Sequence, residues 1–184
     1  MVEARTTPEA GYDSVAKALH WLIVALLIAQ FAVAWTMLDI GRGTQPETLI
    51  NLHLSLGMTT LIVAVIRLLW RWRYPVPLIR GNVPLLLRSM ARAAHAMFYL
   101  LLFALPILGW LAASARGWNI AYFGLFNFPR ILSPSPALAG EIGDYHTDLS
   151  HLLLGLVGLH VLGAFYHHRW LRDRLLWRRL PGNQ

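Results

Sequence analysis

The sequence predicts an all-α integral membrane protein, a bundle of four transmembrane helices with both termini in the cytoplasm. Hydrophobic residues make up 57% of the 184 residues and charged residues 14%, whereas roughly a quarter of a soluble domain is charged. The apolar residues gather in four runs, each long enough to cross a hydrocarbon core of roughly 30 Å. With four spans, both termini lie on the same side of the membrane, and the basic residues concentrate on that side.

Segments that contain Pro, Gly or charged residues separate the four apolar runs. A signal peptide is the alternative for the first run, but this run is longer than an h-region and no small-residue cleavage site follows it. We expect one membrane domain, residues 15–170, between a polar N-terminal segment, 1–14, and a basic cytoplasmic tail, 171–184. The four runs are residues 16–38, 49–70, 93–113 and 141–170, and the loop 116–143 joins the last two.

The net charge of +7 would suggest nucleic-acid binding in a soluble protein. Here the basic residues lie beside apolar runs, so we expect no nucleic acid and take the charge as a signal of orientation in a bacterial inner membrane. The side predicted to be cytoplasmic holds Arg5, Lys17, Arg67, Arg71, Arg73, Arg80, Arg88, Arg92, Arg169, Arg172, Arg174, Arg178 and Arg179. The opposite side holds Arg42, Arg116 and Arg130.

Histidines recur at two depths of the predicted bundle, and ionisable residues inside membrane spans are usually functional. His53 and His146 lie near the outer ends of the second and fourth runs, at a depth called here the outer level. His160 follows His146 by 14 residues, which places it about 21 Å deeper and within roughly 40° of the same direction. His20 lies near the cytoplasmic end of the first run, and the depth of His20 and His160 is called the inner level.

Depth therefore predicts two histidine pairs, His53 with His146 and His20 with His160. Two imidazoles that face each other suit the two axial positions of a haem iron, and an iron held in this way favours electron transfer over oxygen activation. Zinc would need four ligands in one cluster. The chain has no Cys, which excludes iron–sulfur clusters and covalently attached haem.

The remaining histidines give weaker signals. His95, at the cytoplasmic end of the third run, is an alternative partner for His160 or an aid to a quinone. His151 points about 140° away from His146, toward another helix or the lipid interface. His167 and His168 are interpreted as interfacial anchors beside Arg169.

Small and basic residues near these histidines suggest room for a porphyrin and its anionic propionates. Plain helix packing and membrane topology are the alternatives for most of them. The candidate small residues are Gly57, Gly155, Gly158, Gly163 and Ala164, and the candidate propionate partners are Arg67, Arg71 and Arg92 at the inner level and Arg116 at the outer level.

Several motifs, in this order and spacing, resemble the bacterial cytochrome b561 family of membrane di-haem cytochromes b. They are His20-Trp21, NLHLSLG from residue 51, RLLWRWRYPVP from residue 67, ALPILGW from residue 104 and YHTDLSHLLLGLVGLHVLGAFYHH from residue 145. The resemblance covers residues 12–181. It implies a four-helix bundle with two haem b groups, and the ligands that it implies are the same His20, His53, His146 and His160.

The resemblance also implies electron exchange with the quinone pool. One type of family member is a superoxide oxidase that passes the electron from superoxide to ubiquinone. In that case superoxide would arrive from the periplasm, drawn by local positive charge such as Arg116 or Arg130. Superoxide is thus the expected electron donor, and ubiquinone or another membrane quinone the expected acceptor.

Two other functions stay open at this point. The chain resembles, at the level of the bundle, cytochrome b subunits of membrane hydrogenases and formate dehydrogenases, which would require a protein partner. Its short loops favour the superoxide oxidase type over such a subunit. A non-redox four-helix transporter is the third possibility, and it predicts a purified protein without a reduced-minus-oxidised visible spectrum.

Overall fold

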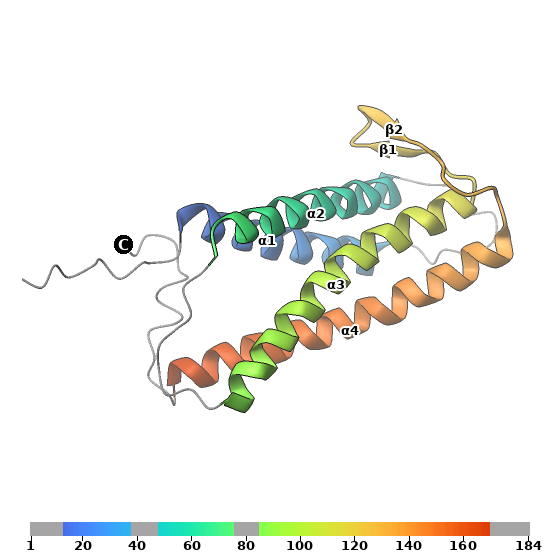
Figure 1. Cartoon of the computed structure of the whole chain (residues 1–184). Coiled ribbons are helices and arrows are strands. Elements are labelled where there is room, and N and C mark those ends of the chain that lie inside the picture. Colours follow the sequence, from blue (N-terminus) through green and yellow to red (C-terminus); the bar gives the residue numbers. More distant parts are fainter. Residues whose placement is uncertain (1–12, 38–47, 76–84, 170–184) are drawn as a thin grey trace, which may run out of the picture.

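The computed structural model describes residues 13–37, 48–75 and 85–169, with side chains up to residue 166. Four helices make up the bundle: α1 Ser14–Thr36, α2 Thr48–Arg73, α3 Leu85–Ala115 and α4 Pro136–Arg169. All four are long and apolar enough to cross a membrane, which confirms the all-α, four-helix membrane fold. The helices alternate in direction, so the start of α1 and the end of α4 lie at the same end of the bundle (Figure 1).

The bundle consists of two antiparallel pairs, α1 with α2 and α3 with α4, joined by packing of α2 on α3. Figure 1 shows the two pairs diverging toward the end at which α1 begins. One core cluster unites α1, α2 and α3 around Ile23, Val63 and Leu102. Large apolar side chains elsewhere are exposed, such as Ile28 and Leu159, as expected of a surface that faces lipid.

Polar contacts fix the start of α1 against the end of α2. Asp13 caps α1 by accepting a hydrogen bond from the backbone N–H of Val15, and its second oxygen accepts one from the Trp70 indole at 2.6 Å. Arg67 donates to the carbonyl oxygen of Ala16 at 2.9 Å. One turn of α2 thus holds the first turn of α1 in place through two side-chain hydrogen bonds.

A short β-hairpin lies between α3 and α4, in a segment that the sequence analysis treated as loop. Strands β1 Ile120–Tyr122 and β2 Phe126–Phe128 pair antiparallel, and β1 packs on α2. The turn between them holds Phe123 at a φ of 47°, a left-handed conformation that is rare for a bulky residue. The hydroxyl of Ser55 on α2 accepts a hydrogen bond from the Phe123 N–H at 3.0 Å, which fixes the turn.

Two helices begin earlier than the apolar runs suggested. α3 begins at Leu85 rather than near residue 93, and α4 begins at Pro136 rather than near residue 141. Pro136 suits a first helical position because proline has no N–H to leave unsatisfied there. The last residues of the predicted first and fourth runs, Leu38 and Trp170, lie outside the described residues.

We predict that Ser55→Ala destabilises the bundle by about 1 kcal/mol, because the part-buried Phe123 N–H loses its acceptor. The free energy of unfolding in mixed micelles, from a denaturing-detergent titration, measures the effect. Ser89→Ala is the matched control, since the exposed Ser89 hydroxyl only contacts the Leu86 carbonyl of its own turn. An equal loss in both variants would contradict the role given to Ser55.

Candidate functional site: facing histidines at two levels

At the outer level, the structure brings the rings of His53 of α2 and His146 of α4 together, edge to face. Their ring centroids are 6.1 Å apart and their planes are inclined by 75°. Two imidazoles bonded to one metal through nitrogens at about 2 Å have centroids roughly 6 Å apart. This pair therefore has the separation that a single metal ion between the two rings requires.

α3 determines the orientation of the His146 ring. The Nδ1 atom of His146 lies 3.0 Å from the carbonyl oxygen of Leu105. Since a carbonyl can only accept, Nδ1 carries the proton and donates it, which leaves Nε2 with its lone pair for a metal. Gly109, one turn further along α3, leaves the space for the ring, because a Cβ there would lie 3.5 Å from Cε1 of His146.

α1 contacts His53 through Gln30, a residue that the sequence analysis did not single out. In the amide orientation that satisfies all partners, the Gln30 nitrogen lies 3.0 Å from the His53 carbonyl oxygen and 3.3 Å from His53 Nδ1. The Gln30 oxygen accepts from the Gly57 N–H at 3.3 Å. A polar side chain inside an otherwise apolar span was the signal that could have identified it.

At the inner level, the ring of His160 lies beside His95 of α3. The ring centroids of His95 and His160 are 6.0 Å apart with planes inclined by 74°, and Phe98 contacts His160 at 5.2 Å. His20, the predicted partner of His160, is half-buried on α1 with its ring 5.8 Å from that of Trp21. The pairing of His20 with His160 stays a prediction, and His95 is its competitor.

A layer of leucines separates the two levels. Leu101 and Leu105 of α3 and Leu153 of α4 are buried there. Partly buried apolar residues from three helices pack around them: Leu27, Phe31, Phe98, Leu149, Leu156 and Val157. The two histidine levels are therefore separate sites with an apolar core between them.

The outer end of the bundle carries a positive charge beside the His146 level. Arg116, just after α3, donates to the carbonyl oxygen of Ala139 at 2.9 Å and stacks over the Trp118 ring at 5.4 Å. Partial burial lowers the pKa of Arg116 from its usual value, and the negative charge of Asp144 opposes that shift. Arg116 is also close to Gly143, one turn before His146 on α4.

The other predicted positions have varied surroundings. His151 is exposed on α4, and Arg71 and Arg92 are exposed as well. Gly57 is buried, and a Cβ there would approach the Gln30 amide to 3.2 Å. A Cβ on Gly155, Gly158 or Gly163 would meet no atom within 4 Å, so these glycines leave open space rather than admit a neighbouring helix. The side chains of His167 and His168 lie outside the described residues.

Four membrane helices with pairs of histidine rings close together in the interior are typical of membrane cytochromes of the b type, and sequence comparison identifies the family. Residues 11–182 match the model of the prokaryotic cytochrome b561 family. The chain belongs to this family, as its motifs predicted. It is thus a bacterial multi-pass membrane protein that transfers electrons, and its family implies haem b.

Individual relatives align along nearly their whole lengths. A protein of Yersinia pestis named "probable superoxide oxidase CybB" is 32% identical over 174 residues, which cover 92% of this chain and 96% of the relative. Cytochrome b561 homolog 2 of Escherichia coli K12 is 34% identical over 179 residues, covering 95% and 93%. Cytochrome b562 of Cereibacter sphaeroides is 26% identical over 178 residues, covering 94% and 96%.

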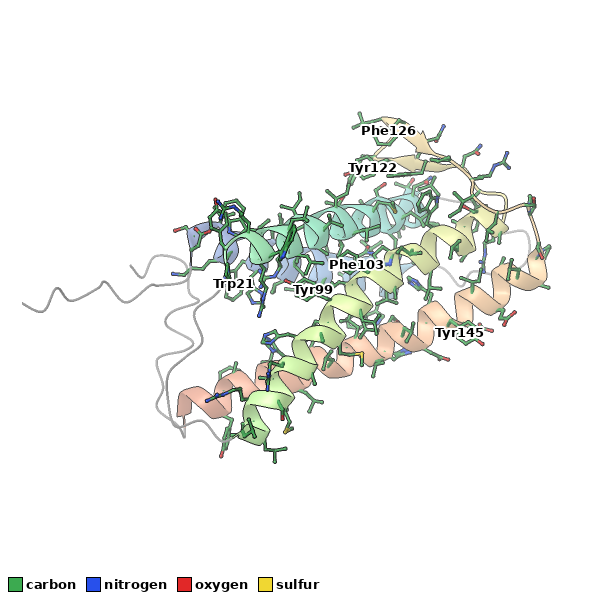
Figure 2. All side chains as sticks on the ribbon, viewed as in Figure 1. Trp21, Tyr99, Phe103, Tyr122, Phe126 and Tyr145 are labelled. Atoms are coloured by element: carbon green, nitrogen blue, oxygen red, sulfur yellow. The ribbon has the colours of Figure 1, made fainter. Side chains whose placement is uncertain are left out.

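The residues present fit haem b. The outer level offers two imidazoles at the right separation, and His146 has its Nδ1 proton bound by a carbonyl. The Tyr99 hydroxyl, on α3 four residues after His95, is buried and has no hydrogen-bond partner among the described residues. Tyr99 and Phe103 lie on the side of α3 that faces α1 and α2 (Figure 2). A buried hydroxyl needs a partner, and a bound group with polar substituents supplies one.

We predict that Gly109→Leu empties the outer level of haem, because its side chain would displace the His146 ring from the Leu105 carbonyl. Gly109→Ala is the control, since a Cβ at 3.5 Å from the ring is an ordinary contact. Haem per polypeptide, measured by pyridine haemochrome, should fall in the leucine variant only. Full haem content in Gly109→Leu would show that this glycine does not set the ring position.

Proposed function

We propose that the chain holds two haem b groups and passes electrons from superoxide to ubiquinone across part of a bacterial inner membrane. His53 and His146 hold the outer haem, and His20 and His160 hold the inner one. One observation carries the proposal: the ring centroids of His53 and His146 are 6.1 Å apart, and Nδ1 of His146 is hydrogen-bonded to the Leu105 carbonyl oxygen. Haem bound in this way supplies one-electron transfer.

Ligation of a haem by two histidines would determine which reactions the outer level favours and which it disfavours. His53 and His146 would be the residues that hold the haem, and a haem held by two histidines would supply electron transfer rather than oxygen activation. Among the described residues no three His, Asp or Glu side chains converge, which disfavours a conventional zinc cluster. The protein's contribution is to hold two imidazoles at fixed orientation and to keep the interior dry.

Superoxide as donor is supported by Arg116, a cation at the outer end whose charge is partly offset by that of Asp144. Two superoxide anions give up one electron each and leave as oxygen, while one ubiquinone takes both electrons and two protons to become ubiquinol. Arg116 lies at the end of the bundle next to the His146 level, where a cation raises the local concentration of a small anion. The relative named "probable superoxide oxidase CybB" supports the same donor.

The inner level has two candidates for the partner of His160. The family resemblance favours His20 of α1, whereas the ring of His95 lies 6.0 Å from that of His160. The two helix pairs diverge at this end of the bundle (Figure 1). We retain His20 as the ligand and assign His95 to the surroundings of the inner haem or of a bound quinone.

We predict that His53→Ala or His146→Ala removes one haem and leaves the other, and that His160→Ala does the reverse. Each variant deletes one axial ligand of one level, and the leucine layer keeps the levels independent. Pyridine haemochrome quantitation with low-temperature reduced spectra measures the number and identity of the haems that remain. Wild-type protein should hold two haems per chain.

The same measurement distinguishes the two candidates at the inner level. His20→Ala should abolish the inner haem, and His95→Ala should shift its spectrum but retain it. Loss of the inner haem in His95→Ala alone would transfer the ligand role to His95. Equal loss of both haems in every folded variant would contradict two independent histidine pairs.

We predict that Arg116→Gln lowers kcat/KM for superoxide by roughly tenfold, at the low end of electrostatic steering effects, and weakens its dependence on ionic strength. Ubiquinol formation in proteoliposomes with an enzymatic superoxide source measures the rate. Arg88→Gln, at the opposite end of α3, is the control and should leave the rate unchanged. Wild-type protein with two haems but no superoxide-dependent ubiquinol formation would contradict the proposed donor.

A further inference from the structure

Gln30 is a polar residue of an apolar span that contacts a candidate haem ligand on the neighbouring helix. Its amide nitrogen is 3.0 Å from the His53 carbonyl oxygen and 3.3 Å from His53 Nδ1, and its oxygen is 3.3 Å from the Gly57 nitrogen. Gly57 permits this contact, since a Cβ at that position would approach the end of the Gln30 amide to 3.2 Å. The absence of a side chain at Gly57 on α2 therefore leaves space for the Gln30 amide of α1 to reach His53.

The chemistry of an amide allows Gln30 to bind either tautomer of His53. A side-chain amide carries two N–H donors and an acceptor oxygen on one planar group, and half a turn about its last torsion exchanges them. When Nδ1 of His53 carries no proton, the amide nitrogen donates to it. When Nε2 binds a metal, Nδ1 carries the proton and needs an acceptor. The amide then takes the exchanged orientation, in which its oxygen occupies the position 3.3 Å from Nδ1 and its contacts with the His53 carbonyl oxygen and the Gly57 N–H are given up.

We propose that Gln30 is the positioning residue of His53: its amide oxygen accepts the Nδ1 proton of the ligated imidazole and thereby sets the ring orientation and the basicity of this ligand. The inference rests on the proposed function, because it takes His53 as an axial ligand of the outer haem. The Nδ1 proton of the facing ligand, His146, is already bound by the backbone carbonyl of Leu105. Each ligand of the outer level thus has its own acceptor, one from backbone and one from a side chain.

Because the acceptor for His53 is a side chain, a substitution at residue 30 should change the midpoint potential of the outer haem. A stronger acceptor at Nδ1 increases the electron donation of the imidazole, which stabilises the ferric form and lowers the midpoint potential. An apolar side chain removes the acceptor and raises the potential. The Leu105 carbonyl cannot be removed by substitution, so residue 30 is the position at which the hydrogen bonding of this ligand pair can be changed.

The test uses Gln30→Glu, Gln30→Met and the wild-type chain, each purified with its haems. Glutamate keeps the length of the side chain and offers a stronger acceptor, whereas methionine keeps the length and offers almost none. Optical redox titration should give an outer-haem potential that rises in the order Gln30→Glu, wild type, Gln30→Met, with the inner potential unchanged. The low-spin electron paramagnetic resonance signal of the outer haem should shift in the methionine variant, because the His53 ring is no longer oriented.

Haem retention provides an independent measurement. Loss of a hydrogen-bond partner of a metal ligand commonly weakens metal affinity by roughly 10- to 100-fold, so Gln30→Met should release the outer haem faster and Gln30→Glu should restore retention. Thr36→Val is the matched control, a polar-to-apolar change on the same helix whose hydroxyl contacts only the Ala32 and Val33 carbonyls. Neither potential should change in that variant.

The outcomes separate this inference from the proposed function. Wild-type protein without an outer haem would remove the proposed function and the role of Gln30 with it. Two bound haems with the same outer potential in all three forms of residue 30 would overturn the role of Gln30 alone. Equal shifts of both potentials in Gln30→Met would also overturn it, because they would report a general change in packing.

Discussion

The structure depends on the contact of α3 with the His146 ring. The Leu105 carbonyl and the space left by Gly109 both lie on α3, and they hold an imidazole of α4 toward an imidazole of α2. Because α3 packs on α2 as well as on α4, the same helix fixes the distance between the helices that carry His53 and His146. Inside a bilayer an imidazole without a partner is costly, so the pairing is a structural necessity as well as a chemical one.

The sequence predicted the fold class and the four spans because these follow from hydrophobic length. Depth matching grouped His53 with His146, whose rings the structure brings together, and their role as haem ligands stays a prediction. Periodicity gives the direction of a side chain relative to its own helix and says little about how neighbouring helices are rotated. For that reason depth matching paired His160 with His20, while the structure brings the His95 ring beside it. Gln30 and Gly109 escaped notice for the same reason, since their roles exist only between helices.

The hairpin escaped prediction because its strands are only three residues long and its turn uses a phenylalanine where a glycine or asparagine would be typical. Such a turn is stabilised by the rest of the protein, here by Ser55 of α2. The early start of α3 also escaped prediction, for a different reason. Its first residues include Arg88 and Ser89, which lower the local hydropathy without preventing a helix.

The leucine layer between the histidine levels has a bioenergetic consequence. Leu101, Leu105 and Leu153 have no side-chain donors or acceptors, so these three side chains offer nothing to a file of water molecules or to a proton relay. Under the proposed function, an electron that crosses this layer would not be accompanied by a proton carried on these side chains. Its movement would be electrogenic, and the membrane voltage would act on it in proportion to the fraction of the bilayer that the layer spans.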